Sequence, residues 1–181
     1  MSMLPANTFK RALREGRPQI GLWSTIPSPF VCEMIGGAGY EWVLLDTEHT
    51  PTDVPLMLGQ LQAVAAALPA PGALPVHAVV RPACNDAVLI KRYLDLGAQS
   101  LLLPFVQNAQ QARDAVRAMR YAPQGMRGMG GSTRAANFGR TADYVARAAD
   151  ELCLLVQVET AEALEQICLL YTSDAADEED S

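Results

Sequence analysis

The stretch VHAVVRPACNDAVLIKRYLDLGAQSLLLP, residues 76–104, decides the fold. Its two ends, Val76–Arg81 and Ser100–Pro104, are short and mostly apolar, which predicts strands that are buried on both faces. Between them, Asn85-Asp86 can begin a helix and Gly97 can end it. A strand, a helix and a second strand in this order predict a parallel pair joined by a right-handed crossover.

The same alternation continues on both sides of this unit. Ser28-Pro29 and Asn108 offer further helix starts, and another helical pattern begins at Ala161. The segment Tyr121–Arg140 is rich in Gly, Arg, Ser and Asn, and connections of this length are often functional. We predict three more strands, Gln19–Trp23, Glu41–Asp46 and Leu152–Glu159. Strands that alternate with helices in this way predict an α/β protein with a parallel sheet.

Polar residues at the strand ends favour a barrel over an open sheet. Asp46, Arg81 and Glu159 each follow an apolar run, and (β/α)8 barrels build their active sites at the carboxyl ends of their strands. An open sheet that binds a dinucleotide needs a G-x-G-x-x-G turn after its first strand. The first predicted strand is followed by Ser24–Pro29 instead, so the sequence lacks that fingerprint.

The composition predicts one domain that binds a small molecule. Half of the 181 residues are apolar, which is enough for a sizeable core. No apolar run approaches the roughly 18 residues of a membrane span, and Met1–Asn7 lacks the layout of a secretory signal, so we expect a cytoplasmic protein. Five acids near the C-terminus account for most of the net charge of −6, so we expect no nucleic-acid or membrane partner. The four separated cysteines predict buried thiols.

A carboxylate and an imidazole follow the second predicted strand, in Asp46-Thr-Glu-His49. Histidine transfers protons near neutral pH, and a neighbouring carboxylate can orient its ring. The alternative is that His49 is an exposed or internally satisfied side chain without a chemical role. Its position at the carboxyl end of a strand, next to acidic residues, favours catalysis.

Arg81, Gln157 and Glu159 extend the candidate site. Arg81 emerges from the core at the same end of the sheet, where a guanidinium can bind a carboxylate through two hydrogen bonds or stabilise enolate charge. The alternative for Arg81 is an ion pair with Asp46 or Glu48. Strand alternation places Gln157 and Glu159 on the same side of the last strand. The Glu159 carboxylate would suit a hard divalent cation.

Taken together, these residues resemble the HpcH/HpaI aldolase family from Gly21 to Ile167. The resemblance rests on Gly21-Leu-Trp23, Ala38-Gly-Tyr-Glu-Trp42, Leu45-Asp-Thr-Glu-His49, Val80-Arg-Pro82, Gly97-Ala-Gln-Ser-Leu-Leu-Leu-Pro104, Arg127-Gly-Met-Gly130 and Leu155-Val-Gln-Val-Glu159. It implies a (β/α)8 TIM barrel of the phosphoenolpyruvate/pyruvate type, of which only about the first five β/α units are present. It also implies a carbon–carbon lyase that reversibly cleaves 4-hydroxy-2-oxo acids to pyruvate and an aldehyde through a metal-bound enolate.

The resemblance also implies a role for each candidate residue. His49 would be the catalytic acid/base, and Asp46 would orient it. Arg81 would bind the pyruvate oxygens and act in catalysis, while the substrate would also contact Gln157 and Trp23. Glu159 would be a metal ligand.

The implied cofactor is a divalent cation, Mg²⁺ or Mn²⁺, with Co²⁺ or Zn²⁺ as alternatives. The implied partners are a 2-oxo acid substrate and, in the family, further copies of the chain in a homohexamer. The sequence contains two lysines, Lys10 and Lys91, and both fall in helical patterns away from strand ends, which disfavours a Schiff-base mechanism.

The sequence departs from the family in two places. Thr47 stands where a glycine is common, and the family's second metal ligand, an Asp on the next strand, would lie beyond the resemblance. Residues 168–181 resemble one reading frame of a sequencing-library adapter. We therefore expect a partial aldolase barrel domain over 1–167 and a non-native tail over 168–181; the alternative is a natural acidic C-terminus. We expect this polypeptide to bind metal poorly, to show little activity and not to assemble as the family does.

Two alternative functions stay open. The first is an acyl-CoA lyase of the citramalyl or malyl type, which uses the same enolate chemistry on the same barrel. The second is a non-catalytic binding or assembly module.

Overall fold

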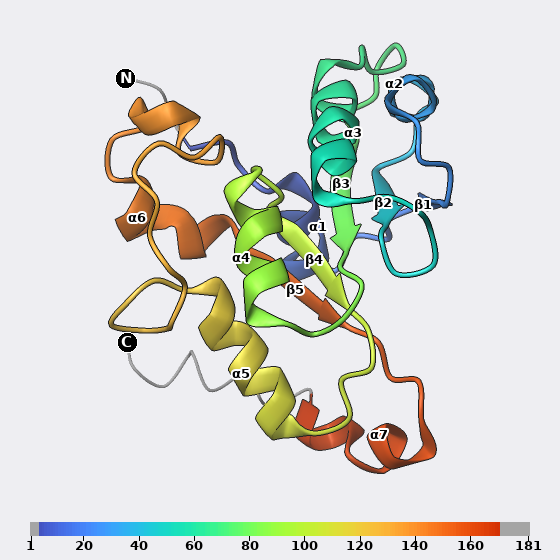
Figure 1. The fold of residues 1–181 in the computed structure, drawn as a ribbon. Coiled ribbons are helices and arrows are strands. Elements are labelled where there is room, and N and C mark those ends of the chain that lie inside the picture. The colour runs from blue at the N-terminus through green and yellow to red at the C-terminus, as the bar shows by residue number, and fades with distance from the viewer. Residues whose placement is uncertain (1–3, 171–181) are drawn as a thin grey trace.

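A parallel sheet of five strands forms the centre of the fold (Figure 1). The structure is a computed structural model, and it describes residues 4–170. The strands lie in sequence order and pair in parallel: β1 Gly21–Ser24, β2 Trp42–Asp46, β3 His77–Arg81, β4 Ser100–Leu103 and β5 Cys153–Val156. All five predicted strands are therefore confirmed. Order and direction match the first five strands of a (β/α)8 barrel.

Helices follow the strands as predicted. The connections contain α2 Pro29–Gly36, α3 Val54–Ala66, α4 Ala87–Asp95, α5 Ala109–Met119, η1 Asn137–Gly139, α6 Tyr144–Arg147 and η2 Ala148–Glu151, and α7 Ala161–Glu165 follows β5. The side chains of Ser28, Asp86 and Asn108 each accept a backbone N–H in the first turn of a helix, as their sequence positions predict. These caps fix where α2, α4 and α5 leave the carboxyl end of the sheet.

Strand alternation divides the core into two layers. On the outer face, Leu45, Val80 and Leu101 pack against the apolar side of α4. On the inner face, Leu44 and Val79 pack against a helix that precedes the sheet. Both faces are apolar, which explains why the strands are continuously hydrophobic in sequence.

The helix on the inner face is α1, Thr8–Arg14, which lies behind the sheet in Figure 1. Its Phe9 stacks on His77 with 5.7 Å between ring centroids and contacts Trp42 at 5.8 Å. Asn7 accepts the Lys10 N–H, and its side-chain amide donates to Ser100 Oγ at 3.0 Å and to the carbonyl oxygen of Glu151. Because His77 and Ser100 begin their strands, α1 closes the amino end of the sheet.

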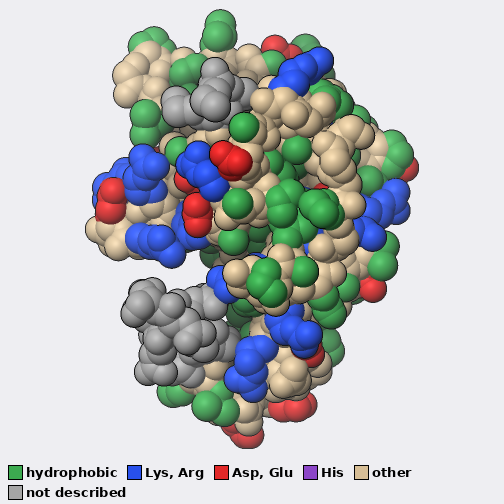
Figure 2. Space-filling view, turned by 90° about the vertical axis from the view of Figure 1, so that its left-hand side faces the viewer, with side chains coloured by type: hydrophobic (Ala, Val, Ile, Leu, Met, Phe, Trp, Pro, Cys, Tyr) green, Lys and Arg blue, Asp and Glu red, His purple; other side chains and the backbone are tan. Residues whose placement is uncertain are grey.

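The long connection between α5 and β5 also lies at the amino end. It is anchored to the last turn of α4, where Arg127 pairs with Asp95 at 2.7 Å and Arg134 donates to the carbonyl oxygen of Leu96. Figure 2 faces the side of the molecule on which this connection lies, and there basic and acidic side chains are intermixed. The anchors of the segment Tyr121–Arg140, predicted to be functional because of its length, are therefore at the end of α4 opposite to the candidate site, although Met126 lines a hollow with Asn85 and Gln111 at the starts of α4 and α5.

The structure differs from the sequence expectations at the end of the fifth strand and at the cysteines. The fifth strand ends at Val156, three residues earlier than predicted. The prediction that all cysteines are buried is wrong, because Cys84 and Cys168 are exposed, although Cys32 is buried. Within residues 4–170, no helix has both the length and the apolar character to cross a membrane. Most of the predicted tail, residues 171–181, lies outside the described residues.

Candidate active site at the carboxyl end of the sheet

The site is built around a buried ion pair at the ends of β2 and β3. Asp46 and Arg81 are paired in the register of the two strands, so both side chains point to the inner face. Arg81 Nε donates to Asp46 Oδ1 at 2.9 Å, and Nη2 donates to Oδ2 at 2.8 Å. The Asp46 side chain is fully buried and that of Arg81 is 8% exposed. This two-pronged geometry fixes the plane of the guanidinium.

Three more side chains surround the Arg81 guanidinium. Nη1 donates to Gln157 Oε1 at 3.2 Å and lies 2.7 Å from Glu48 Oε2, an ion pair without hydrogen-bond alignment. The ring of Trp23 stacks on the guanidinium carbon, which lies 4.5 Å from the ring centroid. The predicted residues Asp46, Arg81, Gln157 and Trp23 are therefore brought together. The ion pair that was the alternative for Arg81 forms with both acids.

Electrostatics keep this pair charged. Burial by itself raises the pKa of Asp46, but hydrogen bonds from Arg81 and from the backbone amides of Glu48 and His49 outweigh it, so the pKa lies below its ordinary value. Burial lowers the pKa of Arg81, and the neighbouring carboxylates more than compensate. Arg81 is therefore a fixed guanidinium whose charge is balanced by the Asp46 and Glu48 carboxylates.

His49 lies at the edge of this cluster. Its side chain is 73% exposed, and Nε2 is 3.8 Å from Glu48 Oε1. The carboxylate beside the imidazole is thus Glu48, whereas the family resemblance implied Asp46 in that place. The physical reason is that both Asp46 oxygens already accept hydrogen bonds from Arg81, and Asp46 Oδ1 also accepts the Glu48 N–H at 2.9 Å. His49 is accessible to a ligand from solvent.

Gln157 and Glu159 follow β5. The N–H of Gln157 donates to the carbonyl oxygen of Leu103 at 2.9 Å, so the ladder extends one residue past the strand and Gln157 still points inward. Glu159 lies beyond that point and is exposed, so the alternation argument does not place it. Its Oε1 is 3.4 Å from the Phe105 N–H, and its charge helps to raise the pKa of Arg81. The loop that follows β5 therefore brings Glu159 beside the cluster. The alternation of side chains along the strand does not.

Among the described residues, Glu159 is the candidate for binding a metal ion. The exposed Glu159 carboxylate has the donor chemistry that a hard divalent cation prefers. The other acids of the cluster, Asp46 and Glu48, are paired with Arg81. Within residues 4–170, no group of three His, Cys, Asp or Glu side chains could hold an ion. Glu159 thus fits one ligand position, and the described residues offer no complete set.

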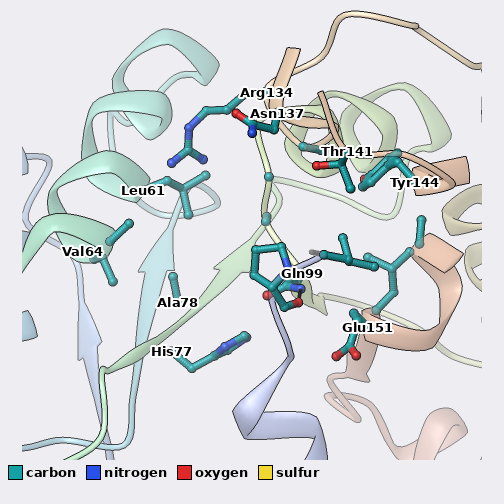
Figure 3. Close-up of a pocket in the computed structure, with 18 of the residues that line it drawn as sticks. Leu61, Val64, His77, Ala78, Gln99, Arg134, Asn137, Thr141, Tyr144 and Glu151 are labelled. Carbon is teal, nitrogen blue, oxygen red and sulfur yellow. Dashed lines mark hydrogen bonds between the residues drawn. The ribbon is translucent and has the colours of Figure 1, made fainter. Parts of the chain in front are cut away.

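A hollow lies at the other end of the sheet from the candidate site (Figure 3). It measures about 470 Å³ and lies between α3 and the connection from α5 to β5, with Leu61, Val64 and Arg134 in its wall. His77 Nε2 there contacts Ser100 Oγ at 2.8 Å, and burial lowers the pKa of His77 to about 4. These polar groups hold the amino end together.

Two residues that contact Arg81, Glu48 and Thr47, were given no role from the sequence. Glu48 was noted as an acidic neighbour of His49 and as a possible ion-pair partner of Arg81 but was given no role, yet it contacts both Arg81 and His49. Thr47 was noted only as a departure from the family, and its contacts lie on the outer face of the sheet. Strand alternation after Asp46 could have placed Thr47 on that face, but it could not have identified its partners.

The fold and the site define a class: a parallel (β/α)-barrel type protein with an arginine–carboxylate cluster at the carboxyl ends of its strands. The family model described as HpcH/HpaI aldolase/citrate lyase matches residues 19–176. The chain belongs to this family.

Relatives and solved structures agree with this assignment. The chain is 51% identical over 174 residues to a protein named pyruvate aldolase from Rhizobium etli, covering 96% of this chain and 66% of that protein. It is 49% identical over 172 residues to 4-hydroxy-2-oxo-heptane-1,7-dioate aldolase from Klebsiella pneumoniae subsp. pneumoniae, covering 94% and 62%. The crystal structure of a HpcH/HpaI aldolase/citrate lyase family protein from Burkholderia cenocepacia matches with a TM-score of 0.87 and 36% identity, over 93% of this chain and 65% of that one. The chain thus spans somewhat less than two thirds of these relatives.

Proposed function

We propose that this chain carries the pyruvate-binding part of a divalent-metal-dependent pyruvate aldolase. The reaction is the reversible aldol cleavage of a 4-hydroxy-2-oxo acid to pyruvate and an aldehyde. The observation that carries the proposal is the Arg81 guanidinium, held by Asp46 and Trp23 at the open end of the sheet. A fixed guanidinium suits a carboxylate that must keep one orientation while charge develops next to it. The names of the relatives support the same chemistry.

In this proposal each residue has a role that its position allows. Arg81 and Gln157 bind the carboxylate and keto oxygens of pyruvate, and Trp23 covers that end of the substrate. His49, which is exposed, exchanges a proton with the hydroxyl group of the aldol, and Glu48 orients the imidazole. Glu159 would hold the cation. When bound, Mg²⁺ or Mn²⁺ would act as a Lewis acid that favours loss of a methyl proton from pyruvate.

The test follows exchange of the pyruvate methyl protons with D₂O by NMR, and pyruvate release from a 4-hydroxy-2-oxo acid by a lactate dehydrogenase assay. We expect both to require Mg²⁺ or Mn²⁺ and to stop after chelation. R81K should slow proton exchange and pyruvate release by about 100-fold or more, because a lysine cannot make the two-pronged contacts of the guanidinium. R140K, at an exposed arginine next to Phe138, is the matched control. Activity that survives exhaustive chelation would contradict the proposal.

The assay includes the longer product of the gene beside the 181-residue chain. We propose that residues 168–181 are not native; sequencing the source DNA past the codon for Ile167 tests this directly. The partial donor set around Glu159 supports low activity for the chain as given. A homo-oligomer and a cytoplasmic location are also proposed, and light scattering and cell fractionation of the longer product test them.

Acyl-CoA lyase chemistry is the second candidate function, because the matching family model joins aldolases to citrate lyase. Assays with CoA thioesters beside free oxo acids separate the two. A binding module without catalysis would instead bind oxalate, an analogue of the pyruvate enolate, and show neither proton exchange nor cleavage.

A further inference from the structure

Thr47 makes a set of buried contacts on the side of the sheet opposite to the candidate site. It directly follows Asp46, so its side chain points outward, toward α4. The Thr47 N–H donates to the carbonyl oxygen of Arg81 at 3.0 Å, and the Thr47 hydroxyl donates to the same oxygen at 2.7 Å. The Tyr93 hydroxyl, on α4, donates to Thr47 Oγ1 at 3.1 Å. Thr47 is 6% exposed and Tyr93 2%.

These contacts form a continuous chain from α4 to the backbone of Arg81. The Tyr93 hydroxyl donates to Thr47, and the Thr47 hydroxyl in turn donates to Arg81, so each hydroxyl proton has one acceptor. Successive hydrogen bonds of this kind polarise and strengthen one another in a buried setting. The network therefore ties an outer helix to the last residue of β3.

The Arg81 carbonyl, at the end of β3, accepts two donors from Thr47. Pairing between β3 and β4 stops at Val80 with Leu101, whereas pairing with β2 continues to Arg81. Both donors from Thr47 reach the Arg81 carbonyl from β2. A glycine at position 47 would keep the N–H but lack the hydroxyl, so the second donor depends on the threonine side chain.

We infer that Thr47, supported by Tyr93, is a positioning residue that fixes the Arg81 guanidinium at the candidate site. The inference rests on the proposed function, in which Arg81 binds the substrate carboxylate. Thr47 itself faces away from the site and acts through the Arg81 backbone. Movement of that backbone shifts the plane in which the guanidinium meets Asp46 and a bound carboxylate.

The test measures hydrogen exchange at Arg81 Nε–H by ¹⁵N NMR of the 181-residue chain, with the signal assigned by its absence in R81K. T47V keeps the shape of the side chain and removes the hydroxyl, so both its hydrogen bond to the Arg81 carbonyl and the one it accepts from Tyr93 are lost. We expect exchange to become roughly 2- to 10-fold faster, because about that factor corresponds to the lost donor to Arg81. T47S should restore the original rate. T141V, at a buried threonine near the other end of the sheet, should leave it unchanged.

Y93F is the second variant, in case T47V does not fold. It removes the donor to Thr47 while the Thr47 hydroxyl still reaches Arg81, so exchange should rise less than in T47V. A T47V chain with a lower melting temperature and the original exchange rate would mean that Thr47 is merely structural and would overturn the inference. Failure of T47S to restore the rate would overturn it as well.

The exchange measurement needs neither substrate nor turnover, so it separates this inference from the proposed function. If the longer product of the gene releases no pyruvate, the aldolase proposal fails, while the exchange rates of the 181-residue chain still test Thr47. If it is active, T47V should raise KM for pyruvate by a larger factor than it lowers kcat. If T47V changes KM and kcat by equal factors and leaves the exchange rate at Arg81 unchanged, Thr47 is not a positioning residue.

Discussion

Replacing Arg81 by methionine should destabilise the protein more than almost any other single change at the candidate site. Methionine fills much of the same volume but leaves the buried Asp46 carboxylate without two of its hydrogen bonds, at 2.8 and 2.9 Å. The Glu48 N–H remains as a donor to that carboxylate. Removing one partner of a buried ion pair costs about 3–5 kcal/mol. That is a large part of the roughly 5–15 kcal/mol by which a domain is stable.

The double variant R81M/D46L shows whether this cost is due to the unpaired charge. With both charges replaced by apolar groups, the free energy of unfolding should return to within about 1 kcal/mol of the original, or exceed it, because desolvation of the pair is no longer required. The double variant should nevertheless be inactive in the aldolase assay. Stability and function would then be separated at a single pair of residues.

The loss of stability in R81M should depend on pH. In the unaltered chain the folded-state pKa of Asp46 is depressed, so its contribution to stability is present above the ordinary pKa of about 3.9 and is lost as pH falls through the folded value. In R81M, burial raises the pKa of Asp46 and Arg81 no longer opposes this effect. Protonation of Asp46 at lower pH therefore removes the cost of a buried, unpaired carboxylate. The stability difference between R81M and the unaltered chain should therefore shrink as pH falls from 7 to 4.5.

Urea unfolding followed by circular dichroism, at pH 7 and pH 4.5, measures these differences. A cost below about 1 kcal/mol for R81M at pH 7 would mean that the pair is much better solvated than its geometry indicates. A double variant as unstable as R81M would mean that packing, and not charge, dominates at this position.

Three further predictions concern the amino end and the edge of the sheet. G21A should lose about 1–3 kcal/mol, because an added Cβ would lie 2.2 Å from the Trp42 ring, while G131A, with nothing within 4 Å, should stay near zero in the same urea assay. His77 has a folded pKa of about 4 against an ordinary 6.5, so stability should fall by about 3 kcal/mol as pH drops between these values, and H77Q should abolish that slope in pH-dependent melting. N7A should cost about 2–4 kcal/mol and raise hydrogen exchange throughout α1, because it removes a helix cap and two buried hydrogen bonds; unchanged α1 protection would contradict this.

The sequence was enough to predict the sheet because its signals are local. Continuous apolar runs identified all five strands, and side-chain caps such as Ser28 and Asn108 located the starts of helices. The residues around Arg81 could also be found, since strand alternation and a shared strand end bring Asp46 and Arg81 together. Patterns of this kind involve one element, or two neighbouring strands.

The hydrogen-bond and ion-pair partners of these side chains could not be predicted in the same way. Asp46 has two possible partners close by, and only the geometry shows that Arg81 occupies both of its oxygens, which leaves Glu48 beside His49. The length of the 121–140 segment suggested function, but its location depends on contacts such as Arg127 with Asp95, between residues far apart in sequence. The periodicity of apolar residues does not indicate contacts between side chains that are far apart in sequence.

The hydrogen bonds at the two ends of the sheet use different side chains: His77 contacts Ser100, whereas Arg81 contacts Asp46 and Gln157. His77 begins β3 and Arg81 ends it, about 13 Å apart at the rise of a parallel strand. Free-energy changes at sites this distant, without common partners, usually add. Loss of stability from altering the substrate end can therefore be offset by strengthening the contacts of α1 at the opposite end. Variation in substrate range and compensation for it can accumulate independently in one small domain.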